Sequence, residues 1–345
     1  MNEIRLVDLV IARIPNLKAR QRAVLCKNFT TDNEIEALCV LSPSEIKLFC
    51  AKELSKNNDK QGELFTESQA AQRQKKLSAM AKDSFSMEDV RHQAEKDAVF
   101  MEKLGINCVS ITCTDYPPLL KEIFDPPAVI FYRGNLDAVK NNTVAIVGTR
   151  KAQAQSLNFC YKITKALGDA GVTVVSGLAL GIDAMAHRGN IEGGAPTVAV
   201  LGSSVDQIYP SSNRNLARRI LEGCGAILSE YPPQTHPAKW RFPERNRIIS
   251  GLCPFTLVIE AGEKSGALIT ADFALEQNRE LAVASVGDHV FGIGCERLAA
   301  DGAKKITCVN DIFEETGFAP PSTEHKDITS KKNLACQLAD DLGIL

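Results

Sequence analysis

Three arginines lie within seven residues of the segment RFPERNRIIS, which spans residues 241–250. They are Arg241, Arg245 and Arg247, and the segment lies between two apolar stretches that are typical of buried parallel strands. The whole chain has a formal net charge of only -2, so the positive charge is local. A fold does not need clustered guanidinium groups in order to pack, and guanidinium pairs well with phosphate. The segment therefore predicts a site for an anionic ligand.

Small and polar residues follow three other apolar stretches, at points where a helix is expected to begin. They are Gly148, Thr149 and Arg150 after the first stretch, Ser176, Gly177, Gly181 and Asp183 after the second, and Glu260, Gly262, Ser265, Gly266 and Thr270 after the third. Because ligands bind at the carboxyl ends of parallel strands, we expect these residues to gather at one edge of a sheet. Glycine lets a ligand approach the backbone, and the first turn of a helix offers unpaired N–H groups. Together with the arginines, the junctions predict a phosphate-binding pocket.

Each of these signals also has a plainer explanation. The arginines of segment 241–250 can pair with Glu230 and Glu244 on an ordinary surface. His187 is more typical of a core or capping residue than of a ligand, and Asp183 is more typical of a helix cap than of a catalyst. A strand followed by glycine and a helix occurs in most doubly wound folds. Both the strict G-x-G-x-x-G fingerprint and the Walker A pattern are missing.

Apolar runs alternate with helical stretches from Ile106 to Val309, which predicts an α/β fold with a parallel sheet covered on both faces. The expected strands are 144–148, 173–176, 197–201, 226–229, 256–260, 281–284 and 306–309. The expected helices are 157–170, 182–192, 216–222, 267–277 and 296–300. The arginine segment is expected as a loop between the fourth and fifth of these strands.

Residues 1–97 are expected to form a small all-helical domain with a linker, since Leu6, Leu9, Val10 and Ile14 recur on one helical face. Residues 13–29 could form a helix-turn-helix or helix-hairpin-helix unit, but the sequence favours a plain pair of packing helices with solvated lysines. The polar, Gln-rich residues 51–97 suit an exposed helix or a linker. The sheet domain is expected at 98–315. The tail, 316–345, is expected to hold at most one helix, at 333–342, and no winged helix.

The composition argues against secretion and against a membrane protein. Eleven cysteines are scattered from Cys26 to Cys336 without a C-x-x-C pair or zinc spacing, as is typical of buried thiols in a reducing compartment. No apolar run is long enough to cross a bilayer, and Asp8 and Arg13 interrupt the first apolar stretch, so no signal peptide is expected. We expect a cytoplasmic protein.

No catalytic motif accompanies the predicted pocket. A Ser/His/Asp order, a nucleophile elbow, an H-E-x-x-H pair and carboxylates at metal spacing are all missing from the sequence. An arginine-lined groove without these groups is typical of a binding protein, so we expect no enzyme activity, no cofactor and no metal. Such a groove would hold a phosphodiester backbone by charge and by N–H groups, without reading the base sequence.

Motifs in the region from Asp97 to Val309 resemble those of the DNA-processing protein A family (DprA, also called Smf). They are DYPPLLKEIFDPPAVIFYRG, VAIVGTR, VVSGLALGIDAMAH, TVAVLG, YPSSN, ILSEYPP, RFPERNRIISGL, VIEAGEKSGALITADFALEQNRE and DGAKKI. The resemblance implies an extended Rossmann-like domain after a small helical domain. It also implies a homodimer that binds single-stranded DNA, and duplex DNA more weakly, without sequence preference. Such a protein protects the DNA and loads the RecA recombinase during transformation or recombination.

The resemblance also assigns roles to residues. The family's pocket motifs fall on Gly148, Thr149, Arg150, Ser176, Gly177, Gly181, Ile182, Asp183, Phe242, Pro243, Arg245, Asn246, Arg247, Ser265, Gly266 and Thr270. Arg150, Arg245 and Arg247 are expected to neutralise phosphates. Phe242 or Trp240 is expected either to stack on a base or to pack beneath the arginine loop. Leu180 and Ser211 stand where the family commonly has a basic residue, and each lost phosphate contact is expected to lower the DNA affinity.

Two other functions stay open on the sequence. A nucleotide-processing enzyme that resembles the phosphoribohydrolases would use Glu260, Glu263 or Glu276 as its catalytic glutamate. The segment EAGEKSGALIT, however, lacks the Pro-Gly-Gly-x-Gly-Thr pattern of those enzymes. A sensor of a small nucleotide would use the same pocket without turnover.

Overall fold

The computed structural model describes residues 4–58, 85–287 and 289–319. The contacts divide the chain into two compact units. The smaller holds the chain up to Tyr116 together with Asp125–Ile130, and the larger holds Pro117–Phe124 and the chain from Phe131 onward. The helix expected at 333–342 and residues 59–84 of the expected linker lie outside the described residues.

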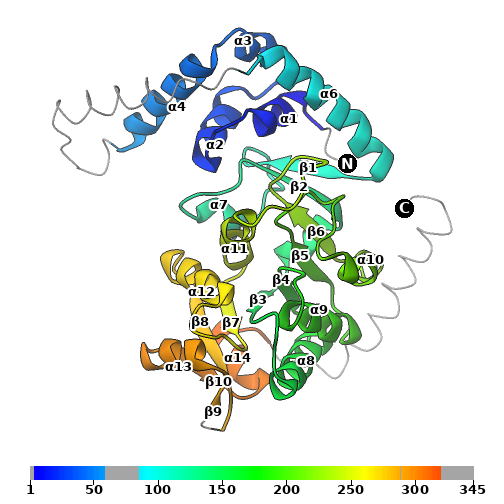
Figure 1. The fold of residues 1–345 in the computed structure, drawn as a ribbon, viewed down its shortest axis with the longest axis vertical. Helices are drawn as coiled ribbons and strands as arrows, with labels where there is room; N and C mark the ends of the chain where they lie inside the picture. The colour runs from blue at the N-terminus through cyan, green and yellow to red at the C-terminus, as the bar shows by residue number, and fades with distance from the viewer. Residues whose placement is uncertain (1–3, 59–84, 288, 320–345) are drawn as a thin grey trace. The chain divides into compact units, whose positions relative to one another are not determined.

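The larger unit is built on a mostly parallel β-sheet (Figure 1). Its strands are β2 (Val129–Gly134), β3 (Thr143–Val147), β4 (Thr173–Ser176), β5 (Thr197–Val200), β6 (Ala226–Ser229), β7 (Phe255–Val258), β8 (Glu280–Val286), β9 (His289–Val290) and β10 (Lys304–Ile306). The first two residues of β2 belong to the smaller unit, and the rest of the strand, from Phe131, belongs to the larger one. The hydrogen-bonded order is β2-β6-β5-β4-β3-β7-β8-β10, and β9 pairs with β8. Only the β2–β6 and β8–β9 pairings are antiparallel among the strands described here. Since β3 lies between β4 and β7, the strand order reverses beside it, which is where open α/β sheets bind ligands.

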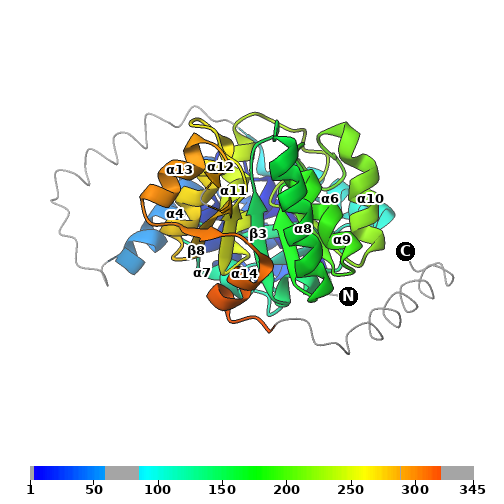
Figure 2. The ribbon, with the colours of Figure 1, turned by 90° about the horizontal axis from the view of Figure 1, so that it is seen from below.

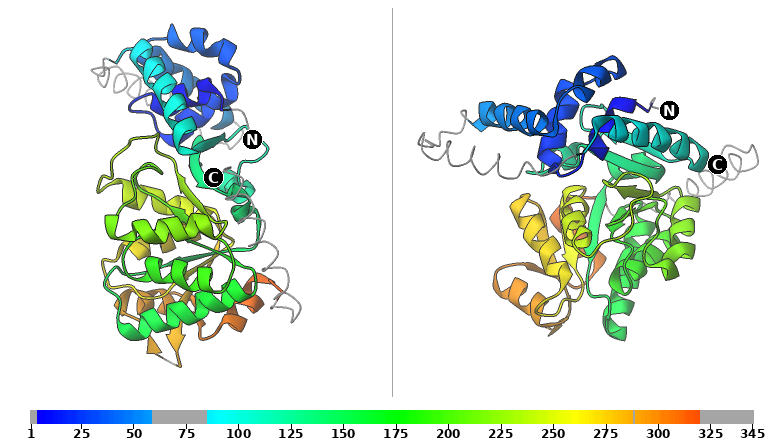
Figure 3. Two further views of the ribbon diagram at one scale, coloured as in Figure 1. Left: turned by 90° about the vertical axis from the view of Figure 1, so that its right-hand side faces the viewer. Right: turned by 45° about the horizontal axis from the view of Figure 1, so that its top comes forward.

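Helices cover both faces of this sheet. They are α7 (Pro118–Glu122), α8 (Ala154–Asp169), α9 (Ile182–Glu192), α10 (Arg214–Glu222), α11 (Arg241–Gly251), α12 (Gly266–Glu276), α13 (Ile293–Ala300) and α14 (Val309–Thr316). Helices α8, α9 and α10 lie on one side of the sheet, and α11, α12 and α13 lie on the other (Figures 1, 2 and 3). The fold predicted from the sequence, an α/β protein with a parallel sheet, is confirmed.

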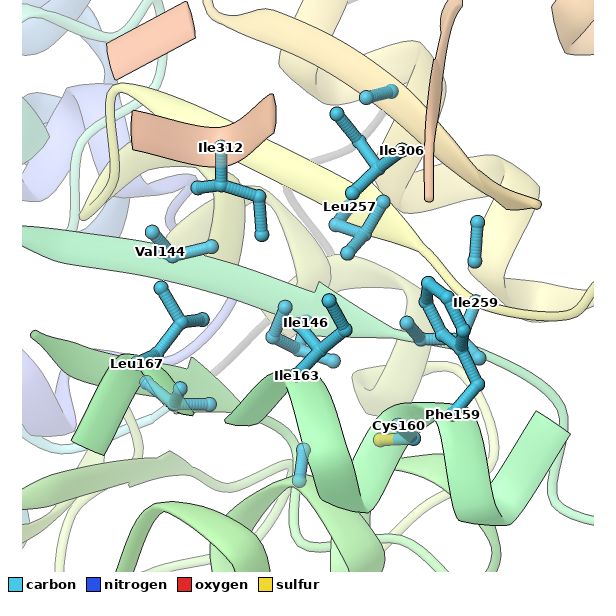
Figure 4. Packing of buried hydrophobic residues seen from close by; sticks show 14 of the residues in the cluster. Val144, Ile146, Phe159, Cys160, Ile163, Leu167, Leu257, Ile259, Ile306 and Ile312 are labelled. Atoms are coloured by element: carbon cyan, nitrogen blue, oxygen red, sulfur yellow. The ribbon is translucent and has the colours of Figure 1, made fainter. Parts of the chain in front are cut away.

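The core on the α8 side consists of aliphatic side chains from strands and helices. Val144 and Ile146 of β3 face Ile163 and Leu167 of α8, and Ile312 of α14 closes the same layer (Figure 4). All five are at most 4% exposed. Burying one such side chain stabilises the fold by roughly 1.5–3 kcal/mol, so this layer fixes where β3 ends and where its following junction lies.

Most of the expected helices and strands are present, but the structure differs from the prediction at two segments, 241–250 and 306–309. The segment that was expected as an arginine loop is the helix α11, Arg241–Gly251. The strand expected at 306–309 ends at Ile306, and Val309 already begins α14. Strands β2 and β9 and helix α7 were not predicted. The expected strand 173–176 and the expected helix 182–192 coincide with β4 and α9.

The smaller unit is largely helical, as expected. Its elements are α1 (Leu6–Arg13), α2 (Ala19–Asn28), α3 (Ile35–Cys39), α4 (Pro43–Asn58), α6 (Met87–Leu104), which runs through the boundary expected at residue 97, and the strand β1 (Asn107–Ser110). Leu9, Val10 and Ile14 are buried, and Arg13 pairs with the buried Asp97 of α6 at 2.6 Å. Helices α1 and α2 pack on each other, but only α2 lies within residues 13–29, so the helix pair expected there is not present as a pair. Across all the described ranges, every helix is too short or too polar to span a membrane.

Candidate nucleic-acid interface

The residues expected to bind a ligand lie at the carboxyl ends of β3, β4 and β7 and at the start of α11 and α12. At the first junction, the Thr149 N–H donates to the Glu260 carbonyl at 2.8 Å, and the Ile182 N–H donates to the Thr149 carbonyl at 3.2 Å. These bonds join the segments that follow β3, β4 and β7. The three junctions therefore meet at one edge of the sheet, as the sequence predicted.

Two of the glycines at this edge serve contacts within the protein. A Cβ at Gly148 would lie 2.6 Å from the Ile182 side chain, so this glycine lets α9 pack against β3. Gly181 has φ +76°, and a Cβ there would lie 2.7 Å from the Arg150 carbonyl. Both glycines are half-buried, and close packing of the junctions already accounts for glycine at these positions. A DNA contact at them stays a prediction.

Arg245 points into the protein. Only 4% of the residue is exposed, and its Nη1 donates to the Gly177 carbonyl at 2.9 Å and to the Val200 carbonyl. Burial lowers the pKa of Arg245 to about 10, and the nearby Asp183 carboxylate opposes that shift. The side chain thus joins α11 to the ends of β4 and β5. A phosphate-binding role for this guanidinium, as expected from the sequence, does not fit its position.

Arg247 is also occupied. Its Nη1 and Nη2 each donate to a carboxylate oxygen of Glu230 at 2.6 Å, and Nη1 also donates to the Glu244 carbonyl at 2.9 Å. The Arg247 side chain is 5% exposed and the Glu230 side chain 12% exposed. The pairing with Glu230 that the sequence offered as an alternative is therefore present, although it is buried rather than on a plain surface. The pair neutralises the charge that was expected to meet a phosphate.

Asp183 and Ser176 support the turn after β4. The Asp183 carboxylate accepts the Ala179 N–H at 3.3 Å, and Gly181 occupies the N-cap position of α9, so Asp183 does not cap that helix. Burial raises the pKa of Asp183, and Arg245 acts against that rise. The Ser176 hydroxyl donates to the Ile146 carbonyl at 2.6 Å and is fully buried.

His187 is a core residue, in agreement with the plainer explanation. It is fully buried, and its Nδ1 lies 2.8 Å from the Thr197 hydroxyl. Since that hydroxyl donates to the Val174 carbonyl at 2.7 Å, Nδ1 carries the proton and donates. Burial lowers the pKa of His187 to about 3, with a smaller contribution from Arg245. The imidazole is therefore neutral and inaccessible to a ligand.

An exposed cation and two aromatic rings lie against one another at this edge. The Arg150 guanidinium lies 5.6 Å from the centre of the Phe242 ring, and the Tyr209 ring centre lies 5.4 Å from that of Phe242. Arg150 is exposed, and Tyr209 is 47% exposed. Phe242 packs over Gly202, where a Cβ would lie 2.9 Å from the ring. We call Arg150, Tyr209 and Phe242 the rim cluster. Leu180 is 47% exposed and adds no charge to this edge.

A second stack lies at the end of β6. The Arg241 guanidinium lies 4.9 Å from the ring centres of both Tyr231 and Trp240, and those rings meet edge to face at 6.4 Å. Trp240 is 61% exposed. Tyr209 was not a predicted site residue, and Trp240 was named only as a possible stacking partner. The aromatic residues that lie beside arginines in the sequence, as in KWRF, were the available signal.

The junction after β7 offers the most open backbone. Ser265 caps α12 by accepting the Ala267 N–H at 3.3 Å, and the Asn246 amide donates to the Gly266 carbonyl at 3.2 Å. A Cβ on Gly262 or Gly266 would meet no atom within 4 Å, so both positions are accessible. Thr270 is buried beneath this turn. The chain at the N-terminus of α12 is thus open to solvent, and a helix N-terminus suits an anion.

Acidic groups at the edge have structural partners. The Glu260 carboxylate accepts the Gln153 N–H at 3.0 Å, and Glu263 pairs with Arg297 at 3.6 Å. Across the described ranges, no three His, Cys, Asp or Glu side chains gather in a way that could hold a metal ion.

This chain is similar to several known proteins. The family model described as "DNA recombination-mediator protein A" matches residues 107–317. DNA processing protein DprA of Bacillus subtilis is 44% identical over 214 residues, which cover 61% of this chain and 71% of that protein. Protein Smf of Escherichia coli is 35% identical over 229 residues, which cover 66% of this chain and 61% of that protein.

Two solved structures are also similar. That of DNA processing protein A from Streptococcus pneumoniae matches with a TM-score of 0.69 and 30% identity, and the match covers 92% of this chain and all of that one. That of DNA processing protein A from Helicobacter pylori concerns its single-stranded DNA binding mode. It matches with a TM-score of 0.55 and 26% identity over 61% of this chain and 94% of that one.

Proposed function

Because this chain belongs to the DNA recombination-mediator protein A family, we propose that it binds single-stranded DNA without sequence preference and delivers it to the RecA recombinase. The Helicobacter pylori relative supports the first part, since its structure concerns single-stranded DNA binding. The recombinase and a second copy of the chain as partners follow from family membership alone, as does action in the cytoplasm.

The rim cluster carries the proposal. Arg150 is an exposed cation, and no carboxylate pairs with it in the part of the chain that the structure describes. It can meet a phosphate, while the exposed surfaces of Tyr209 and Phe242 can stack on bases. Only a single strand presents the faces of its bases, so this combination favours single-stranded over duplex DNA.

The proposed contacts differ from those expected from the sequence. We assign DNA contacts to Gly148–Arg150, Phe242, Asn246, Ser265 and Gly266, and add Tyr209. Arg245 and Arg247 act indirectly, because they hold α11 against the sheet and so present Phe242 and Asn246. Ser176, Gly177, Gly181, Asp183 and Thr270 shape the same edge from within.

Binding without turnover is the favoured activity. Glu260, one of the glutamates that the enzyme alternative would use, is only 8% exposed, and its carboxylate already accepts a backbone N–H. A nucleoside monophosphate incubated with the protein is expected to release no free base. Release that is lost in Glu260→Ala would favour the enzyme instead.

A shift assay with a labelled single-stranded oligonucleotide tests the proposal. Arg150→Ala is expected to weaken binding, whereas Arg218→Ala is the matched control. Arg218 is an exposed arginine on α10 that pairs with Glu222 at 3.3 Å. Tight binding of a mononucleotide with no oligonucleotide shift would favour the sensor, and equal losses in both variants would argue against the rim cluster.

A further inference from the structure

We propose that Trp240 is a second platform for a DNA base, so that a single strand is held along the sheet edge by two aromatic stacks. This inference rests on the proposed function and adds a binding site to it. The platform consists of Trp240, Arg241 and Tyr231, and the base of an extended strand is its occupant.

The exposure of Trp240 is the first observation. Tryptophan is usually highly buried, yet 61% of this residue is exposed. The Arg241 guanidinium lies 4.9 Å from the centre of its ring, and the Tyr231 ring is perpendicular to it at a centre-to-centre distance of 6.4 Å. The Tyr231 hydroxyl donates to Glu244 at 2.7 Å, which fixes that ring. The indole is thus held in one orientation and still has ring surface open to a base.

The charge beside the ring is the second observation. Arg241 donates through Nη1 to the His236 carbonyl, and among the described residues no carboxylate pairs with it. The adjacent Lys239 is exposed. A nucleotide that stacks on Trp240 would therefore bring its phosphate next to uncompensated positive charge.

Continuity with the rim cluster is the third observation. Trp240 and Phe242 are two residues apart at the start of α11. Phe242 packs over Gly202, just after β5, and Tyr231 follows β6, the strand paired with β5. Paired strands lie about 4.8 Å apart, and stacked nucleotides rise about 3.4 Å each, so the two stacks lie within reach of one short stretch of DNA.

The chain reports on this site by itself, because Trp240 is its single tryptophan. A single-stranded oligothymidine is expected to quench the indole fluorescence over the same concentration range in which it changes the anisotropy of a labelled strand. An abasic deoxyribose phosphate oligomer of equal length is expected to produce no quenching, because it has nothing to stack.

Variants separate stacking from folding. Trp240→Ala is expected to weaken oligothymidine binding roughly 5- to 150-fold, the range for loss of one stacked base. Trp240→Phe is expected to retain most of the affinity. Leu275→Ala is the matched control, since Leu275 is 60% exposed and lies in the last turn of α12, away from its N-terminus.

Each contrary result has a distinct meaning. Trp240→Ala that binds within about twofold of the native protein would overturn the platform and leave single-stranded DNA binding intact. Saturable anisotropy without any change in native indole fluorescence would do the same, whatever the folding of the variants. No anisotropy change with the native protein would overturn the platform and the proposed function together.

Discussion

The guanidinium of Arg245 occupies the space in which a side chain at Gly177 would begin. A Cβ at position 177 would lie 2.5 Å from Nη2 of Arg245, whose Nη1 is bound to the Gly177 carbonyl itself. The two residues are 68 positions apart in the chain. Their contact couples the turn after β4 to the first turns of α11.

Gly177→Ala is expected to destabilise the protein by about 1–3 kcal/mol, because the methyl group must displace a guanidinium that two carbonyls hold in place. Urea unfolding followed by circular dichroism measures the change. Gly262→Ala is the control, since a Cβ there meets nothing within 4 Å. Equal stability of the two variants would mean that Arg245 moves aside freely.

Arg247→Ala is expected to destabilise the protein by about 3–5 kcal/mol, because it leaves Glu230 as an unpaired carboxylate in a largely buried position. Replacing both partners by apolar residues, as in Arg247→Met with Glu230→Leu, is expected to restore most of the stability. The free energy of unfolding measures both. If Arg247→Ala is as stable as the native protein and loses only DNA affinity, Arg247 binds phosphate after all.

Arg150→Ala is expected to reduce the dependence of DNA binding on salt. One lost phosphate contact lowers the slope of log K against log salt concentration by about 0.7 for a single strand. The free energy of unfolding should change by less than about 0.5 kcal/mol, because the side chain is exposed. Titrations at several salt concentrations give the slope, and an unchanged slope would remove Arg150 from the phosphate contacts.

Acidification is expected to destabilise the protein partly through His187. Its pKa falls from 6.5 to about 3 on folding, so between these values the unfolded chain binds a proton that the folded chain does not. Stability from this group is complete above pH 6.5 and falls by about 1.4 kcal/mol per pH unit toward pH 3.

The comparison with His187→Gln isolates this effect, because Asp183 acts with the opposite sign. The pKa of Asp183 is raised in the folded protein, so on acidification the folded chain takes up this proton before the unfolded chain does. The contribution of Asp183 to stability therefore increases as the pH decreases toward its unfolded pKa. The difference in unfolding free energy between native and variant protein should therefore narrow on acidification. A difference that does not vary with pH would show that His187 is not the group responsible.

The sheet was predictable from the sequence because its strands are short apolar runs bounded by glycine. Strand β4 lies between Val172 and Gly177, and both of its ends were correct. Helix α11 was missed because its first turns, RFPERNR, have no apolar period and contain Pro243, which a helix tolerates only near its start. The junctions, and so the position of the candidate site, followed from the strands.

Whether each arginine binds a ligand or a group inside the protein could not be predicted from the sequence. Whether a guanidinium faces solvent or the interior depends on acceptors that are distant in the chain. Val200 lies 45 residues before Arg245, and Glu230 lies 17 residues before Arg247. Identical residues in the same motif can therefore bind a ligand or hold the fold, and only their packing distinguishes the two.

The attachment of α11 by two inward-pointing arginines also bears on the speed of binding. A surface that is already in its bound shape has little ordering entropy to lose when a ligand arrives. We therefore expect oligonucleotide association to be a single kinetic phase whose rate rises in proportion to protein concentration, without a slow rearrangement afterwards.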